Sequence, residues 1–338
     1  MAIELSTKYS ALVDAKLNAE IVQKDGIVWN TKYEGDPKAG AVKVPVRGAS
    51  TVTSYNKQNG ASKSYADGNY ITLNINKDKA VNEIIDGLDA ASVPDNIIAD
   101  RLDSASYGLA LELNNDATAE LLDKATVKGE TSALTNSNIY GRVVDAATKL
   151  TKAFVPARGR VMLINPDAQS KLLKSNEFIS ASNLGDEVKQ SGAIGQIAGF
   201  TVYVDATLPA NANFICLHKE WCARVKYWVK DVHLQDLNGS GDYIGASAVQ
   251  GRVAYGHLVT NSAAVVMDSA VLDGSAAIAS HSATYTKDSK ATSAKYRING
   301  GAWNDYSAAV DTTAGDVIEF YGVDANGVRS GIVSAKDE

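Results

Sequence analysis

The amino-acid sequence predicts an α+β fold that is followed by a small all-β region at the C-terminal end. Apolar residues recur at steps of three and four over about residues 95–125, which predicts one long helix. Short segments in which apolar and polar residues alternate, such as AVKVPVRG and YITLNI, predict strands. After Asp273, short strand-like runs are separated by turn signals, which is typical of a β-sandwich.

The composition is that of a soluble globular protein. The chain has 338 residues, of which 45% are hydrophobic and 21% charged, and this length suggests about two domains. The formal net charge of −6 gives no electrostatic footprint for binding nucleic acid, which requires clustered Lys and Arg. Two cysteines, Cys216 and Cys222, do not form a disulfide framework, so we expect a reducing compartment.

The sequence predicts neither export nor a membrane location. Glu4, Lys8 and Asp14 interrupt the apolar positions at the N-terminus, which therefore lacks the apolar core of a signal peptide. The longest apolar runs, such as SAAVVM, fall far short of the roughly 20 residues that a membrane-spanning helix needs. We expect a soluble cytosolic product.

The first 80 residues predict an amphipathic arm and a long hairpin. Apolar residues at helical spacing from Leu5 to Ile21 predict an arm over about 1–26. Two alternating runs, centred on Val44 and Leu73, enclose a polar tract of Gly, Ser and Asn and predict a hairpin. Because two strands alone are marginal in water, we expect the hairpin to lie against another part of the structure or another subunit.

Helices and strands alternate irregularly through the middle of the chain. A short helix is expected from Asn82 to Val93, and the helix over about 95–125 would be roughly 45 Å long at 1.5 Å per residue. Gly108 or the pair Asn114 and Asn115 could break that helix. The remaining expected elements are a helix capped by Ser137 and closed by Pro156, a strand from Arg160, a helix with Asn165 as N-cap and Pro166 in its first turn, and several strands between Gly199 and Met267.

The run GAIGQIAGFTVYVDATLP is as rich in glycine as a nucleotide-binding loop, but its glycines lie on the wrong side of the strand. Its glycines, at 192, 195 and 199, precede a strand, whereas a dinucleotide fingerprint follows a strand and opens a helix. We interpret Gly195 and Gly199 as permissive backbone at a tight approach to a strand that runs towards Pro209.

No constellation of residues predicts catalysis, a metal or a cofactor. Cys216, His218 and Cys222 lack both a paired C-x-x-C spacing and a fourth zinc ligand, so a junction between a strand and a helix is the better interpretation. Hydrolase, kinase, metalloprotease and Walker motifs are absent from the sequence. The acidic positions of the long helix are interpreted as a solvated or subunit-facing side, namely Asp100, Asp103, Glu112, Asp116 and Glu120.

Aromatic residues beside cations form one further candidate site. Trp221, Tyr227 and Trp228 lie next to Arg224 and Lys226 and could stack on nucleic-acid bases. Core packing with a snorkelling cation explains the same pattern, and we favour it.

The order of these features resembles the major capsid proteins of tailed bacteriophages. The resemblance lies in AFVPARGRVMLINPDAQSKLLKSNEF followed by GAIGQIAGFTVYVDATLP, and in the succession of arm, hairpin and long helix ahead of them. It covers about residues 1–272 and implies that family's N-arm (about 1–26), extended loop (about 40–78), spine helix (about 95–125), and peripheral and axial domains. Within this segment, the residues that we expect to matter for structure or assembly are Pro156, Asn165, Pro166, Gly195, Gly199 and Pro209.

The resemblance implies a shell protein and not an enzyme. Its copies would form the pentamers and hexamers of an icosahedral head around packaged DNA, without sequence-specific binding and without a cofactor or metal. Portal, scaffolding or decoration proteins would be partners, and the shell would assemble in the host cytoplasm to become the virion capsid.

The tail over residues 273–338 resembles small bacterial immunoglobulin-like modules. The runs YRINGGAWNDYSAAV and IEFYGVDANGVRS carry this resemblance, after a small polar segment, LDGSAAIASHS, that we interpret as a linker. Such a module would lie outside the shell and make weak glycan contacts, for which Trp303, Tyr306 and Tyr321 are the candidates.

Two alternative functions remain open from the sequence. One is a soluble carbohydrate-binding surface protein whose C-terminal sandwich recognises the sugar. The other is the shell protein of a bacterial nanocompartment, which would package a cargo protein in place of DNA.

Overall fold

The chain divides into two compact units, each built from separated stretches of sequence. The computed structural model describes residues 21–33, 40–47, 52–61, 68–92, 97–175, 195–239 and 243–338. The first unit comprises Met1–Lys16, Thr31–Leu109 and Ala223–Thr260, and the second comprises Leu17–Asn30, Ala110–Cys222 and Asn261–Glu338. Most of the predicted N-terminal arm, residues 1–20, lies outside the described residues.

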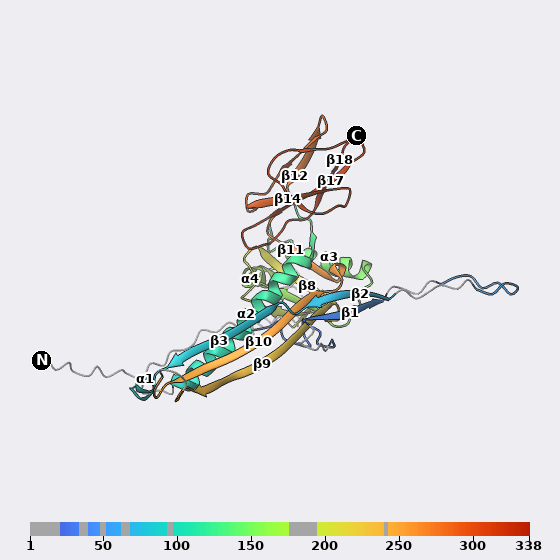
Figure 1. Cartoon of the computed structure of the whole chain (residues 1–338). Coiled ribbons are helices and arrows are strands. Elements are labelled where there is room, and N and C mark those ends of the chain that lie inside the picture. Colours follow the sequence, from blue (N-terminus) through green and yellow to red (C-terminus); the bar gives the residue numbers. More distant parts are fainter. Residues whose placement is uncertain are drawn as a thin grey trace. The chain divides into compact units, whose positions relative to one another are not determined.

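The predicted hairpin is present in the first unit. Strand β1 (Ala41–Arg47) pairs antiparallel with β2 (Gly68–Asn74) in a two-stranded sheet (Figure 1). Alternation places Val44 and Leu73 in a buried cluster with Ala223 and Val225. Strand β2 approaches β10 so closely that a Cβ on Gly256 would lie 2.1 Å from the Asn74 carbonyl oxygen. Within its unit the base of the hairpin therefore packs on a sheet.

That sheet has the order β3-β10-β9 and carries helices along it (Figure 1). Its strands are β3 (Lys77–Ile85), β10 (Ser247–Val259) and β9 (Cys222–Asp236), and the helices are α1 (Gly87–Ser92) and the start of α2 (Ile97–Lys124). Residues 82–85 are strand and not the start of a helix as predicted, because β3 continues its antiparallel pairing with β10 to Ile85. The first turns of α2 pack Ala105 against Ile85 and Val249.

Helix α2 forms one uninterrupted element of 28 residues. Its bounds agree with the helix predicted over about 95–125. The predicted breaks at Gly108 and at the Asn pair do not occur. Asn114 is buried, and its Nδ2 donates to Thr207 Oγ1 at 2.7 Å, so a tertiary hydrogen bond offsets the low helix propensity of asparagine.

The second unit contains a six-stranded mixed sheet with the order β4-β11-β8-β5-β7-β6. Its strands are β4 (Thr126–Lys128), β11 (Val265–Ser269), β8 (Ala212–His218), β5 (Arg160–Ile164), β7 (Phe200–Val204) and β6 (Gln196–Ile197). Strand β5 runs parallel to β7 and antiparallel to β8. All five of its residues are buried, which fits the continuous apolar run RVMLI.

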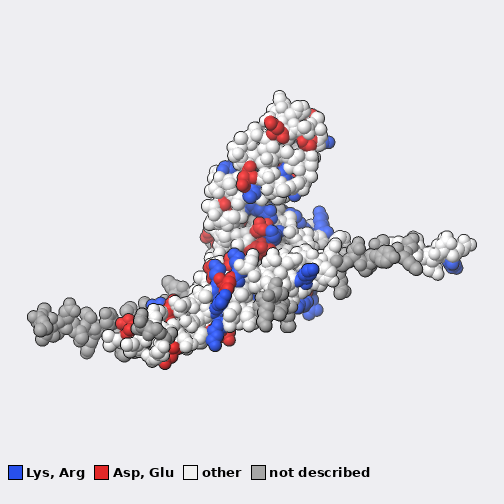
Figure 2. Space-filling model, viewed as in Figure 1, with Lys and Arg blue, Asp and Glu red and all other residues white. Residues whose placement is uncertain are grey.

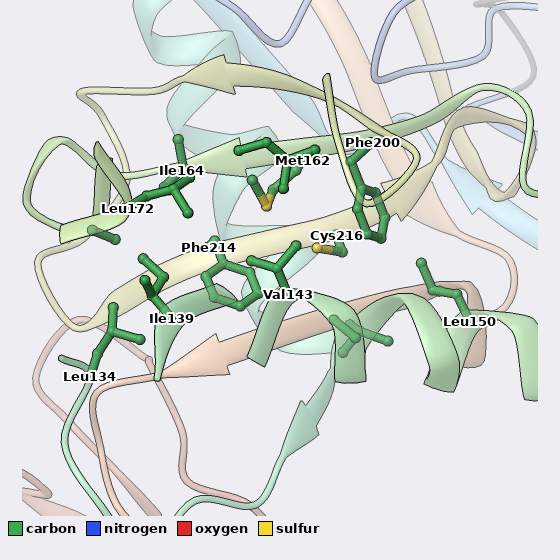
Figure 3. Close-up of a cluster of buried hydrophobic side chains, with 14 of the residues drawn as sticks. Leu134, Ile139, Val143, Leu150, Met162, Ile164, Leu172, Phe200, Phe214 and Cys216 are labelled. Carbon is green, nitrogen blue, oxygen red and sulfur yellow. The ribbon is translucent and has the colours of Figure 1, made fainter. Parts of the chain in front are cut away.

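Two helices cover this sheet and form the principal core with it. Helix α3 (Ile139–Lys152) turns Ile139, Val143 and Leu150 towards Phe214 and Cys216 on β8 (Figure 3). Helix α4 (Pro166–Leu173) contributes Ala168 and Leu172 to the same cluster. The N-cap of α3 is Asn138, not Ser137 as predicted.

The last part of the second unit forms two antiparallel sheets. One has the order β12-β13-β16 and the other β15-β14-β17-β18. The strands are β12 (Ser275–Ala279), β13 (Ser282–Thr286), β14 (Ser293–Ile298), β15 (Asn304–Asp305), β16 (Val310–Asp311), β17 (Val317–Val323) and β18 (Val333–Lys336). Their inner faces share a core around Tyr285 and Phe320. The prediction of a linker is wrong for Ser275–Ala279, because these residues form strand β12 and pair with β13 along their whole length.

Among the described residues, no helix has both the length and the apolar character needed to cross a membrane.

Candidate functional site

The described parts of the segment from Val155 to Pro209, residues 155–175 and 195–209, contain buried polar contacts that fix the middle of the second unit. Asn165 is the N-cap of α4, and its Oδ1 accepts from the Ala168 N–H at 2.7 Å. Its Nδ2 donates to the Ala212 carbonyl at 2.8 Å, so one side chain joins α4 to β8. Pro166 occupies the first turn, where its fixed φ suits a helix and no N–H is needed. The predicted helix start is confirmed.

Arg160 closes the C-terminal end of α3. The residue is 4% exposed. Its guanidinium donates to the carbonyls of Val155 at 2.7 Å and Pro156 at 2.9 Å. It also donates to the Ala147 carbonyl at 3.2 Å. A cation among the last carbonyls of a helix both satisfies unpaired acceptors and opposes the helix dipole. Pro156 itself is exposed, four residues beyond the end of the helix at Lys152.

The two candidate glycines differ in what the backbone requires of them. Gly199 has φ +83° in the turn between β6 and β7, a left-handed conformation that L side chains rarely adopt. Gly195 is exposed, lies outside that region of φ, and has open space around the position of a Cβ. Gly192 lies outside the described residues. The turn therefore depends on one glycine, at the entry to β7.

Asp205, which follows β7 directly, is a buried hub that the sequence does not single out. Its Oδ1 accepts from the Thr207 N–H at 2.9 Å and from Thr207 Oγ1 at 2.6 Å. Its Oδ2 accepts from Gln23 Nε2 at 3.1 Å, and the same amide nitrogen lies 2.6 Å from Thr118 Oγ1. This network joins the segment VDATLP to the start of the described chain and to α2. Pro209, which ends that segment, is half-buried.

A second buried network surrounds Asp268 on β11. The carboxylate accepts from Asn213 Nδ2 at 2.7 Å and from Arg142 Nη1 at 3.3 Å. Arg142 also lies 3.5 Å from Glu130, which Lys128 contacts at 2.6 Å. Burial raises the pKa of Asp268, although Asn213 and Arg142 both stabilise its charged form. Such a network fixes α3 on the sheet, and sequence spacing gives no signal for it because its members are far apart in the chain.

The cysteine and histidine cluster is structural. Cys216 and Cys222 are buried free thiols, separated by the 3-10 helix η2 (Lys219–Trp221), and His218 Nδ1 accepts from the Glu220 N–H at 3.3 Å. This confirms the predicted junction of strand and helix. Burial raises the pKa of Cys222 to about 12, which keeps the thiol protonated at neutral pH. Among the described residues, no group of three His, Cys, Asp or Glu side chains is arranged to hold a metal ion.

The favoured interpretation of core packing holds for Trp221, which packs against the principal core, but it is wrong for Tyr227 and Trp228. Tyr227 is 47% exposed and Trp228 39% exposed on the outer part of β9. The neighbouring Arg224 is buried, and its Nε donates to His257 Nε2 at 2.9 Å, so it does not line a surface with them. The error arose because β9 is a single long strand whose second half leaves the core.

The acidic positions of α2 are divided between two environments. Asp100 and Asp103 are exposed, whereas Glu112, Asp116 and Glu120 are half-buried. On the face drawn in Figure 2, acidic and basic side chains of the described residues are intermixed, without a broad area of one sign. This face offers no extended basic surface to a nucleic acid.

The three aromatic candidates of the tail do not form one site. Trp303 and Tyr321 are in edge contact, with ring centroids 4.5 Å apart, and Arg297 lies over the Trp303 ring. Tyr306 belongs instead to the interior cluster, where its ring meets Phe320 and its hydroxyl accepts from the Tyr285 N–H at 2.9 Å. Only the first two could share a ligand.

Comparison with solved structures identifies the fold. A chain from Mycobacterium phage Che8 is similar over 79% of this chain and 97% of its own, with a TM-score of 0.65 and 20% identity. The capsid structure of the cyanophage P-SCSP1u matches over 79% and 93% (TM-score 0.66, 14% identity), and the mature capsid of bacteriophage PhiM1 over 79% and 96% (TM-score 0.57, 10% identity). No protein-family model and no curated protein sequence matches.

These likenesses define the class of fold to which the chain belongs. The chain has the mixed α/β fold of phage capsid structures, as its sequence predicts. It spans nearly the whole length of the chains that it resembles.

Proposed function

We propose that the chain is a major capsid protein that self-assembles into the icosahedral head shell of a tailed bacteriophage. The observation that carries this proposal is a fold likeness that extends over almost the entire length of chains from phage capsid structures. A likeness that covers 79% of this chain and 93–97% of these neighbours leaves little of the neighbours for a different activity.

The parts of the chain have a natural assignment within such a shell. Residues 1–26 form the N-arm, residues 40–78 the extended loop, and α2 the spine helix. The six-stranded sheet with α3 and α4 supplies the peripheral and axial domains. Residues 273–338 form a separate immunoglobulin-like appendage, and this segment is about as large as the fifth of the chain that the likeness leaves uncovered.

Exposed apolar side chains on the hairpin support contacts with neighbouring copies. Val52 is 92% exposed and Tyr55 74% exposed near the tip, and Tyr70 on β2 is 63% exposed. A two-stranded sheet with such a surface gains stability when another subunit covers it. Pentamers and hexamers of this chain would provide that cover.

The shell would assemble in the host cytoplasm and become the virion capsid. Portal, scaffolding or decoration proteins would be its partners, and packaged DNA would be enclosed without sequence-specific contacts. The intermixed charges in Figure 2 support enclosure over specific binding.

Particles made by co-expression with phage assembly and packaging factors test this function. We expect closed shells that protect DNA from nuclease, and a chain truncated after residue 272 should still form them. Particles that contain a packaged protein in place of DNA would favour a nanocompartment. A truncated chain that is monomeric and has lost a sugar-binding activity of the full chain would favour a carbohydrate-binding protein.

A further inference from the structure

The second unit contains a cleft of about 710 Å³ that the proposed shell function does not use. One wall comes from the end of α2 and from β4, and includes Lys124 and Thr126. The other comes from the sheet β14-β17, where Arg297 and Tyr321 alternate with residues that face the sandwich core. The volume lies within the range of about 300–1,000 Å³ that is typical of small-molecule sites.

Positive charge exceeds negative charge around this cleft. Lys124 contacts Asp123 at 2.5 Å, and Arg297 donates to Glu319 at 2.6 Å, so these two cations have carboxylate partners.

Two other cations of the lining have no carboxylate partner among the described residues. Lys149 Nζ lies 3.4 Å from the Val127 carbonyl, and Arg329 donates to the Ala125 carbonyl. Lys149 is half-buried, and burial together with the neighbouring Lys128 lowers its pKa. A bound anion would oppose both effects, because an opposite charge nearby favours the charged form of Lys149.

Aromatic rings orient the guanidinium groups of the same cleft. The Arg297 guanidinium carbon lies 4.5 Å from the Trp303 ring centroid, and that of Arg329 lies 5.6 Å from the Tyr321 centroid. A guanidinium over an aromatic face is held by the cation–π attraction, which restricts the side chain. This arrangement favours planar recognition of a carboxylate, for which arginine is better suited than lysine.

We propose that this cleft binds a small hydroxylated organic anion with one carboxylate, the chemistry of an acidic sugar. Among the described lining residues, Lys149 and Arg329 are the only cations without a carboxylate partner. Two such cations can neutralise one carboxylate, but they are too few for the several negative charges of a polyphosphate. The hydroxyls of Thr126 and Ser262 and the carboxylate of Asp123, all in the lining, offer partners to sugar hydroxyls. The partly exposed Trp303 adds an apolar surface for a sugar ring.

This site differs from the one that the sequence predicts. It includes Trp303 and Tyr321, excludes Tyr306, and adds Lys149 and Arg329, two cations that no sequence pattern placed beside them. Every residue of the cleft lining belongs to the second unit of one chain. Ligand binding at this site therefore does not require the chain to form a shell.

Isothermal titration calorimetry on the full chain tests the site. Galacturonate, which carries one carboxylate, is titrated as the acidic probe and galactose as the neutral control, with inorganic phosphate and ATP as competing anions. Lys149→Gln removes one cation without leaving a carboxylate unpaired, and Lys152→Gln is its matched control on the exposed side of the same helix. Trp303→Ala is a second variant, which removes the apolar surface for the sugar ring and leaves the charge of Lys149 in place. Thermal unfolding checks that each variant folds.

We expect galacturonate to bind and galactose to bind at least about tenfold more weakly, as the loss of a charged hydrogen bond implies. Lys149→Gln and Trp303→Ala should each weaken galacturonate binding by about tenfold, and Lys152→Gln should not change it. Failure of the folded wild-type chain to bind galacturonate at millimolar concentration would overturn the proposal. Tighter binding of ATP or phosphate, or equal losses for both lysine variants, would also overturn it. Electron microscopy of the same samples reports shell formation separately.

Discussion

Replacement of Asn165 by alanine tests whether one local side chain holds helix α4 on the central sheet. The change removes the hydrogen bond from the Ala168 N–H at 2.7 Å, and loss of such a cap costs about 1 kcal/mol. It also leaves the buried carbonyl of Ala212, a residue that is 0% exposed, without its Nδ2 donor at 2.8 Å, which adds about 1–3 kcal/mol. We therefore expect a loss of about 2–4 kcal/mol in the free energy of unfolding.

A matched variant separates this effect from the general cost of replacing an N-cap. Asn138 precedes α3, but its side chain makes no capping bond to that helix and is half-buried. It accepts instead from the Thr135 N–H at 2.7 Å and donates to the Ala133 carbonyl at 3.0 Å, both in the exposed loop before the helix. Asn138→Ala should cost about 1 kcal/mol, because water can replace these exposed bonds. Urea unfolding monitored by circular dichroism gives both values, and a melting temperature lower by about 5–10 °C should accompany Asn165→Ala. If Asn165→Ala were no more destabilising than Asn138→Ala, the proposed role of the cap would be refuted.

Three further predictions concern the turn, the buried ion pair and the thiols. Gly199→Val should destabilise the second unit by about 1–2 kcal/mol because φ is +83°, whereas Gly195→Val should change the melting temperature little; equal shifts would contradict this difference. Arg142→Met should cost about 3–5 kcal/mol in urea unfolding because it leaves the buried Asp268 unpaired, and a change below 1 kcal/mol would count against the pair. At pH 8 a thiol reagent should label no cysteine in the native chain and two after denaturation, because burial raises the pKa of Cys222 to about 12 and its neighbour is also buried; fast native labelling would show that these thiols are accessible.

Local signals in the sequence predicted the elements whose causes are local. The bounds of α2 agree with its apolar periodicity, and the start of α4 agrees with Asn165 and Pro166, because periodicity and capping act within a few residues. The run RVMLI gave β5 for the same reason.

Tertiary pairing determined the features that the sequence could not give. Residues 82–85 form strand because β10 pairs with them, although the segment also has helical spacing. Arg142 and Asp268 are 126 positions apart, and no local pattern connects them. Tyr306 and Tyr321 look equivalent in the sequence, yet Tyr306 packs against the interior cluster and Tyr321 lines the cleft.

Electron microscopy of the purified chain tests the central claim most directly. Negatively stained samples, prepared across salt and pH and after co-expression with phage assembly factors, should contain closed icosahedral shells built from pentamers and hexamers. Light scattering on the same samples should report particles far larger than one 35.7 kDa chain. Only small species under every condition would contradict the account.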